Sequence, residues 1–229
     1  MPAAIWGEAH GDRLRLEPFA LCPQAAYGAE KGLSFELKPS GMGRGGPDFA
    51  ECSPFGKMPA FRDPGADDGR DFCISDSTAI ITYLEAKHPL PEMIPADPIP
   101  RARTIWWDEF ADTILTAAGT KLFFNRFVAP RVLKIPGDEA VAAAAEAKEL
   151  PPLFDHLEQA IPPSGFLVAD RLTLADLAVA SPFANLDYVG CPIDTARWPV
   201  LAGYVAAIQA RPGFARLIAQ ERAMLAAMG

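Results

Sequence analysis

The sequence has little histidine and cysteine, and it has fewer basic than acidic residues. Three histidines and four cysteines occur among 229 residues, with no CxxC pair and no histidine spaced with a cysteine as a zinc site requires. Lys and Arg total 21 against 29 Asp and Glu, which gives a net charge of −8. Because a nucleic-acid surface needs clustered cations to neutralise phosphate, we expect neither a metal site nor a nucleic-acid partner.

Long apolar runs are also missing. Charge or proline interrupts the longest of them well short of the roughly 18 residues that a membrane span needs. The opening MPAAIWGEAHGDRLRL lacks the basic region and apolar core of a signal peptide. The cysteines lie far apart, at Cys22, Cys52, Cys73 and Cys191. We therefore expect no membrane segment, no disulfide framework and a reduced, cytoplasmic setting.

The chain up to about residue 88 alternates between strand and helix patterns. Strands are expected at 13–19, 33–39, 58–63 and 71–76, with helices at 24–32 and 77–88. The glycine-rich segment 41–48 has no GxGxxG or GKS/T motif, which excludes a P-loop or dinucleotide site. A helix between the first two strands favours a parallel pair, and the close turn between the last two favours an antiparallel one. The pattern predicts a mixed four-stranded sheet.

The remainder of the chain is helical. Five prolines fall within residues 89–100, and we interpret this stretch as a linker. Helical periodicity follows at 101–127, 138–160, 174–188 and 199–210 and again from 212. The organisation predicted is a domain at 1–90, a linker at 91–100 and an all-helical domain at 101–229.

One helix start in the second half has a specific signature. In LTLADLAVAS, Thr173 and Asp176 occupy the N-cap and N3 positions of a capping box, with Leu172 and Leu177 spaced for a hydrophobic staple. This pattern satisfies the N–H groups at a buried helix start, so we expect a structural role. A helix cap of this kind contributes on the order of 1 kcal/mol.

Pro59, in the stretch FGKMPAFRD, stands just before a predicted strand. Proline cannot donate to a sheet ladder, so it either starts an edge strand or keeps the preceding backbone available for a ligand. This stretch, then ISDSTAIITYLEAKHP, the proline-rich segment and FLVADRLTLADLAVAS together resemble the cytosolic glutathione transferase family, in the same order and over nearly the whole chain. The resemblance implies a thioredoxin-like N-terminal domain, an all-α C-terminal domain and glutathione as co-substrate, without a metal.

The resemblance also assigns residues to the glutathione site. Pro59 is expected to be cis, with the backbone of Met58 pairing with the ligand as an added strand. Asp76 and Ser77 are expected to hold the γ-glutamyl end, although Ser77 alone would suit an ordinary N-cap. The glycyl carboxylate needs a cation, and the candidates are Arg44, Lys57 and Lys38.

The sequence departs from the family where the glutathione sulfur is activated. No Ser or Thr occurs between residues 1 and 33, and the usual hydroxyl position falls near Pro18 to Ala20. The backbone N–H groups of Phe19 and Ala20 could stabilise the thiolate at a helix start. Alternatively, Cys22 is the working thiol, or it is a small buried residue. Tyr27 lies too far along the helix to do more than pack.

A second substrate would bind beside apolar side chains of the helical domain. Trp106 and Phe110 share a helix face at i, i+4, and Phe123 and Phe124 add two aromatic rings. The same aromatic residues also suit a helical core.

Three functions are compatible with these residues. The leading one is a glutathione transferase that conjugates the thiolate to a small apolar electrophile, as in detoxification. The second is a glutathione-dependent thiol oxidoreductase that uses Cys22, and the third is a non-catalytic binding or interaction protein. The resemblance further implies a homodimer, with Phe55 as a possible anchor.

Overall fold

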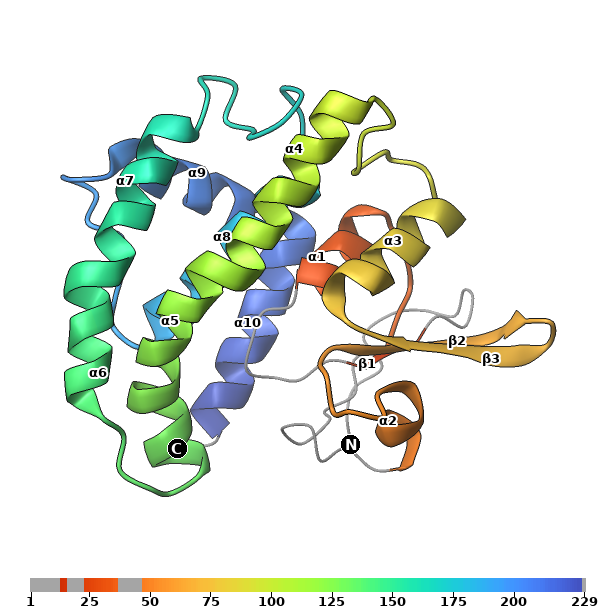
Figure 1. Ribbon diagram of the computed structural model, residues 1–229, viewed down its shortest axis with the longest axis horizontal. Helices are drawn as coiled ribbons and strands as arrows, with labels where there is room; N and C mark the ends of the chain where they lie inside the picture. The colour runs from red at the N-terminus through yellow and green to blue at the C-terminus, as the bar shows by residue number, and fades with distance from the viewer. Residues whose placement is uncertain (1–12, 16–22, 37–46, 228–229) are drawn as a thin grey trace. The chain divides into compact units, whose positions relative to one another are not determined.

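The computed structural model describes residues 13–15, 23–36 and 47–227. The chain divides into two compact units, Met1–Glu92 and Met93–Gly229 (Figure 1). The first helix of the second unit, α4, begins at Pro98, inside the stretch that we interpreted as a linker. Proline suits this position because the first helical residue needs no intrahelical N–H bond. Among the described helices, none combines the length and the apolar character needed to cross a bilayer.

The described part of the first unit contains a three-stranded sheet. Strands β1 (Arg13–Arg15), β2 (Ala60–Asp67) and β3 (Arg70–Ser75) lie in the order β1-β2-β3, and both pairs are antiparallel. The expected strand at 33–39 is not seen, since residues 33–36 have no strand structure and 37–39 lie outside the described residues. The β2–β3 hairpin extends further than predicted, because β2 continues past Pro64 through an irregularity in the ladder.

Helices cover both faces of this sheet. Helix α3 (Ser77–Lys87) packs on one face, where the Tyr83 ring stacks on Phe72 of β3 at 4.4 Å. Helix α2 (Pro47–Cys52) lies on the other face (Figure 1). Successive side chains of a strand point to opposite faces, so Cys73, the residue after Phe72, faces away from α3 and packs against Phe49 and Cys52 of α2. Cys52 and Cys73 form a disulfide, which corrects the expectation of a reduced protein at these two cysteines.

Helix α1 (Pro23–Glu30) packs against α3 and ends as the sequence predicts. Gly32 adopts a φ of 67° and its N–H donates to the Ala29 carbonyl, while the N–H of Leu33 donates to the Gly28 carbonyl at 2.9 Å. A left-handed residue at this position stops a helix and is suited to glycine.

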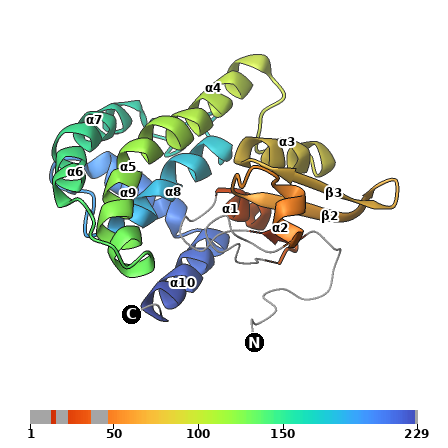
Figure 2. The ribbon, with the colours of Figure 1, turned by 60° about the horizontal axis from the view of Figure 1, so that its bottom comes forward.

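The second unit is entirely helical in its described part. Its elements are α4 (Pro98–Glu109), η1 (Phe110–Leu115), α5 (Thr116–Phe123), η2 (Phe124–Val132), α6 (Glu139–Ala144), η3 (Ala145–Glu149), α7 (Leu150–Ala160), α8 (Leu174–Tyr188), α9 (Pro199–Gln209) and α10 (Pro212–Ala227). Helix α8 is central: it packs against α4, α5 and α9 (Figure 2) and is buried along most of its length. A helix that is apolar on all sides suits this position.

The capping box at the start of α8 is confirmed, and the structure adds to it. The N–H of Thr173 donates to Asp176 at 2.8 Å, as the motif requires. Asp176 also accepts the N–H of Leu167 at 2.9 Å and the hydroxyl of Tyr204 at 3.1 Å. Burial raises the pKa of Asp176, although these hydrogen bonds favour its ionised form.

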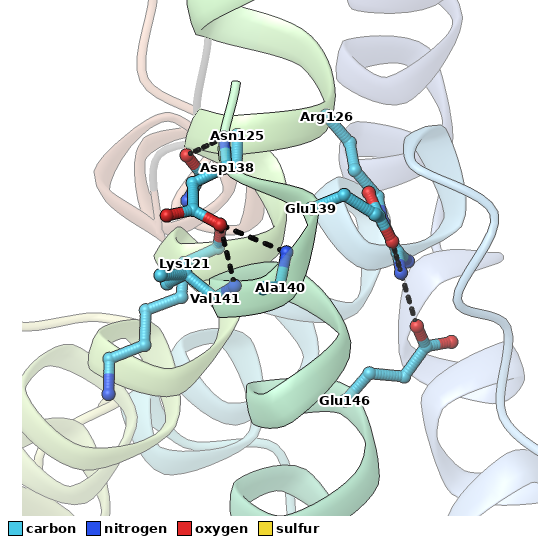
Figure 3. A network of polar contacts seen from close by, with 8 residues as sticks. All are labelled: Lys121, Asn125, Arg126, Asp138, Glu139, Ala140, Val141 and Glu146. Atoms are coloured by element: carbon cyan, nitrogen blue, oxygen red, sulfur yellow. Dashed lines mark hydrogen bonds and ion pairs between the residues drawn. The ribbon is translucent and has the colours of Figure 1, made fainter. Parts of the chain in front are cut away.

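A polar network fixes the turn between η2 and α6 (Figure 3). Asn125 accepts the N–H of Asp138 at 2.8 Å, and Asp138 in turn caps α6 by accepting the N–H groups of Ala140 and Val141. Arg126 pairs with Glu139 at the start of α6 and with Glu146 one element later, each at 2.6 Å.

Candidate functional site

The candidate site lies in the first unit, where the loop after α2 meets the start of α3. The peptide bond between Met58 and Pro59 is cis, as the resemblance implied. The Pro59 carbonyl accepts the N–H of Asp76 at 3.0 Å, and the ladder continues with Ala60 opposite Ser75. This pairing brings the segment that carries Lys57, Met58 and Pro59 beside the segment that carries Asp76 and Ser77.

Asp76 occupies the N-cap of α3 in an uncommon backbone conformation. Its φ is 96°, and its carboxylate accepts the N–H of Ala79 at 3.0 Å. Aspartate tolerates positive φ better than most residues because its short side chain bonds to the nearby backbone. Ser77 is buried and is the first residue of α3. The N-cap of α3 is therefore Asp76, and not Ser77 as the sequence alone suggested.

Lys57 and Asp76 form an ion pair across the site. Lys57 Nζ lies 2.6 Å from Asp76 Oδ2, and the two side chains are 62% and 31% exposed. Partial burial opposes ionisation of Asp76, but hydrogen bonds from Lys57 and Ala79 more than offset it, so its pKa lies below the ordinary value. The site thus presents a carboxylate and an ammonium group, both within reach of solvent.

Ser53 is a residue of this site that sequence reasoning missed. It is 2% exposed, and its hydroxyl donates to the Lys57 carbonyl at 2.6 Å. Gly56, at a φ of 71°, completes the turn, and its N–H donates to the Ser53 carbonyl. The only signal in the sequence was the turn-forming SPFG stretch, which marks a loop without showing what its serine holds.

The buried ammonium group of Lys31 fixes the C-terminal end of α3. Lys31 Nζ contacts Glu85 at 2.6 Å and donates to the carbonyls of His88 and Pro91, each at 2.7 Å. Tyr27, from which we expected packing alone, also donates its hydroxyl to Glu85. Burial, together with this carboxylate, raises the pKa of Tyr27, so its phenol stays protonated. The network fixes the helix whose N-cap is Asp76.

Trp106 and Phe110 lie on one face of their helix, as the spacing predicts. Their rings stack at 5.6 Å, and both pack against His156 of α7. Phe110 is 5% exposed and belongs to the core of the second unit, whereas Trp106 is 51% exposed. Phe123 is buried against Phe127, and Phe124 is exposed. The described contacts of Trp106 and Phe110 are thus those of helix packing within this unit.

The residues expected to activate the sulfur lie outside the described residues. These are Phe19, Ala20 and Cys22, and the cation candidates Lys38 and Arg44 are outside them as well. Within the described part of the chain, no three His, Cys, Asp or Glu side chains gather in a way that could hold a metal ion.

Comparisons with known proteins match both units. Residues 25–92 match the family model "Glutathione S-transferase, N-terminal domain", and residues 139–207 match "Glutathione S-transferase, C-terminal domain". A glutathione S-transferase from Hyoscyamus muticus is 30% identical over 196 residues, covering 82% of this chain and 88% of that protein. The crystal structure of a glutathione S-transferase from Rhodospirillum rubrum superposes with a TM-score of 0.79 at 22% identity, covering 90% of this chain and 91% of that chain. A glutathione transferase from Phanerochaete chrysosporium, solved with oxidized glutathione, has a TM-score of 0.78 at 20% identity and covers 96% and 99% of the two chains.

Proposed function

The chain belongs to the glutathione S-transferase family of enzymes, and on that basis we propose that it conjugates the glutathione thiolate to a small apolar electrophile. Its first unit is the thioredoxin-like domain of the family, and its second is the helical domain. We propose domains at 1–90 and 101–229, joined by 91–100, with helix α4 of the second unit beginning inside the joining segment at Pro98.

The ionised Asp76 at the start of α3 is the observation that carries this proposal. Glutathione ends in an ammonium and a carboxylate on its γ-glutamyl group, and these two charges need complementary partners close together. Asp76 supplies the carboxylate for the ammonium, and the first turn of α3 with Ser77 supplies donors for the carboxylate. Met58, before the cis-proline, offers its backbone to the peptide of the ligand.

The cation for the glycyl carboxylate comes from the loop before Pro59. Lys57 is the described candidate, and at present its ammonium pairs with Asp76. When glutathione binds, the ion pair between Lys57 and Asp76 is replaced by two ion pairs with the ligand. The ammonium group of glutathione pairs with Asp76, and its glycyl carboxylate pairs with Lys57 or Arg44. The exchange keeps both protein charges compensated, which limits the cost of desolvation.

Chemistry begins when the bound thiol loses its proton. In this proposal the proton passes to solvent and the backbone N–H groups of Phe19 and Ala20 stabilise the thiolate. The thiolate attacks an electrophilic carbon and forms a carbon–sulfur bond, while the bond to the leaving group breaks and that group departs with its electron pair. The electrophile binds against apolar side chains of the helical domain, for which Trp106, with its exposed ring, is a better candidate than the buried Phe110.

One observation favours an alternative reaction. Helix α1 begins at Pro23, so Cys22 directly precedes a helix in the sequence. A thiol at a helix N-terminus has a lowered pKa, which suits thiol–disulfide exchange with glutathione. The variant Cys22→Ala separates the two reactions, because conjugation survives the change and disulfide exchange does not. A non-catalytic carrier would show neither reaction.

We also propose a cytoplasmic homodimer in which Phe55 anchors the subunits. The Phe55 side chain is 97% exposed, at the tip of the turn before Lys57. An exposed phenylalanine on a tight turn is suited to insertion into a partner's apolar pocket. Sedimentation of the protein as a monomer at micromolar concentration would contradict this.

The test is a glutathione titration that follows thiolate absorbance across pH. Binding with a thiol pKa well below that of glutathione in solution supports the transferase, and binding with an unshifted pKa indicates a carrier. The variant Asp76→Asn removes the carboxylate charge, and we expect about a tenfold weaker affinity, since a hydrogen bond to a charged group contributes about 1.5–3 kcal/mol. Asp97→Asn is the matched control, because Asp97 caps α4 in the other unit through Ile99. Equal affinity of the two variants would refute the assigned role of Asp76.

A further inference from the structure

The disulfide between Cys52 and Cys73 joins the two segments that form the candidate glutathione site. Cys52 is the last residue of α2 and Cys73 lies in β3, with Cα atoms 4.6 Å apart, which is within the range that disulfides span. Along the sequence, Lys57 follows Cys52 after a short turn, and Asp76 follows Cys73 at the end of β3. The bond therefore links the segment of Lys57 to the segment of Asp76.

Polar contacts complete a ring through this disulfide. Ser53, next to Cys52, donates to the Lys57 carbonyl at 2.6 Å, and Lys57 Nζ lies 2.6 Å from Asp76 Oδ2. The backbone of residues 73–76 then connects Asp76 to Cys73 and closes the ring. Cys52 and Ser53 are both buried, and Ser53 is hydrogen-bonded to the Lys57 carbonyl. A displacement of Cys52 therefore also displaces the backbone of Lys57. A change at the sulfur atoms is transmitted to the two charged groups of the site.

We propose that Cys52 and Cys73 form a thiol–disulfide switch, whose oxidised form holds Lys57 and Asp76 in position for glutathione and whose reduced form releases them. The inference rests on the proposed function, because the ligand whose affinity changes is glutathione. The exchange partners belong to the same chemical class, low-molecular-weight thiols and their disulfides.

The exchange transfers two electrons. A glutathione thiolate attacks Sγ of Cys73, the more exposed of the two cysteines, forms a mixed disulfide and expels the Cys52 thiolate, which takes up a proton. A second glutathione thiolate attacks the glutathione sulfur of the mixed disulfide and expels the Cys73 thiolate, which is protonated in turn. One glutathione disulfide is released, and the protein gains two thiols. Glutathione disulfide reverses both steps.

The test compares ligand affinity in the two redox states of the full chain. The protein is treated with glutathione disulfide or with dithiothreitol, separated from small molecules without air, and assigned a thiol state by alkylation and mass measurement. It is then titrated calorimetrically with S-methylglutathione, which has no thiol to exchange. We expect the oxidised form to bind roughly three- to tenfold more tightly, since the reduced form must order the Lys57 side chain and its loop on binding.

Variants distinguish the switch from general effects of oxidation. The double variant Cys52→Ser/Cys73→Ser is expected to bind with the weaker affinity after either treatment. Cys191→Ser is the matched control, because Cys191 is a buried cysteine of the other unit that forms no disulfide, and this variant should keep the full difference between the two redox states.

Each outcome bears on the switch. Equal affinities of the oxidised and reduced forms would overturn it and leave the proposed function standing. Unpaired thiols at Cys52 and Cys73 after treatment with glutathione disulfide would overturn it as well. No binding of S-methylglutathione in either state would overturn the proposed function and the switch together.

Discussion

Removing the carboxylate of Asp176 should destabilise the helical unit by more than the loss of a helix cap. Asp176 accepts hydrogen bonds from the N–H groups of Leu167 and Thr173 and from the hydroxyl of Tyr204. In Asp176→Ala these three donors lose their acceptor at a site that is closed to solvent. An unsatisfied buried donor costs about 1–3 kcal/mol. The low end of that range for each donor gives a loss of about 3 kcal/mol, and relief of the buried charge offsets part of any larger value.

Asp138→Ala is the matched control for this measurement. Asp138 is also an N-cap aspartate in the helical unit, but it is exposed, and it accepts only the N–H groups of Ala140 and Val141 near the helix start. Solvent can replace these bonds, so we expect a loss of about 1 kcal/mol. Urea unfolding followed by tryptophan fluorescence reports mostly on this unit, because three of the four tryptophans, Trp106, Trp107 and Trp198, belong to it. Equal losses for the two variants would refute the additional contribution of the buried network.

Two further substitutions test other parts of the same unit. Glu221 is buried with its carboxylate accepting the Tyr188 hydroxyl at 2.9 Å, and burial raises its pKa from 4.5 to about 7. An acid whose pKa is raised by folding contributes its full stability below the unfolded pKa, and this contribution is lost as pH rises through the folded pKa. Glutamine carries no such charge, so the stability of Glu221→Gln relative to the parent should rise by about 2–3 kcal/mol between pH 5 and pH 8. A difference in melting temperature that stays constant with pH would contradict this. At Gly137, an added Cβ would lie 1.8 Å from the Asn125 carbonyl oxygen, so Gly137→Ala forces the turn to move and should cost about 2 kcal/mol. Gly203→Ala, on an open helix surface, should instead be neutral or stabilising by up to about 1 kcal/mol in the same urea measurement, and equal effects would contradict the close contact.

Local rules explain which parts of the fold could be predicted from the sequence. The end of α1 at Gly32 and the start of α8 at Thr173 depend on residues within one turn of each other. Such signals are complete in a short stretch of sequence, because the hydrogen bonds that define them are local. The length of the β2–β3 hairpin was underestimated for a related reason: Pro64 marks a break, but the ladder resumes beyond it.

Contacts between distant segments could not be predicted in the same way. Lys57 pairs with Asp76, and Cys52 bonds to Cys73, only because β2 and β3 fold back beside the end of α2. Charge and residue type fix neither partner, since the chain offers many other acids and two other cysteines. The resemblance to a family named Lys57, Asp76 and the cis-proline as candidate site residues, yet it carried no information about the contacts among them.

The two aspartates at helix starts show why the surroundings, more than the motif, decide a role. Asp76 and Asp176 both accept backbone N–H groups at the first turn of a helix. Asp76 is partly exposed and pairs with Lys57, which lowers its pKa, so it stays charged where a ligand can reach it. Asp176 is closed to solvent and burial raises its pKa, and its oxygens accept backbone N–H groups and the hydroxyls of Thr173 and Tyr204. A charged ligand can therefore replace Lys57 as the ion-pair partner of Asp76. No ligand can reach Asp176, so removing its carboxylate lowers the free energy of unfolding of the protein.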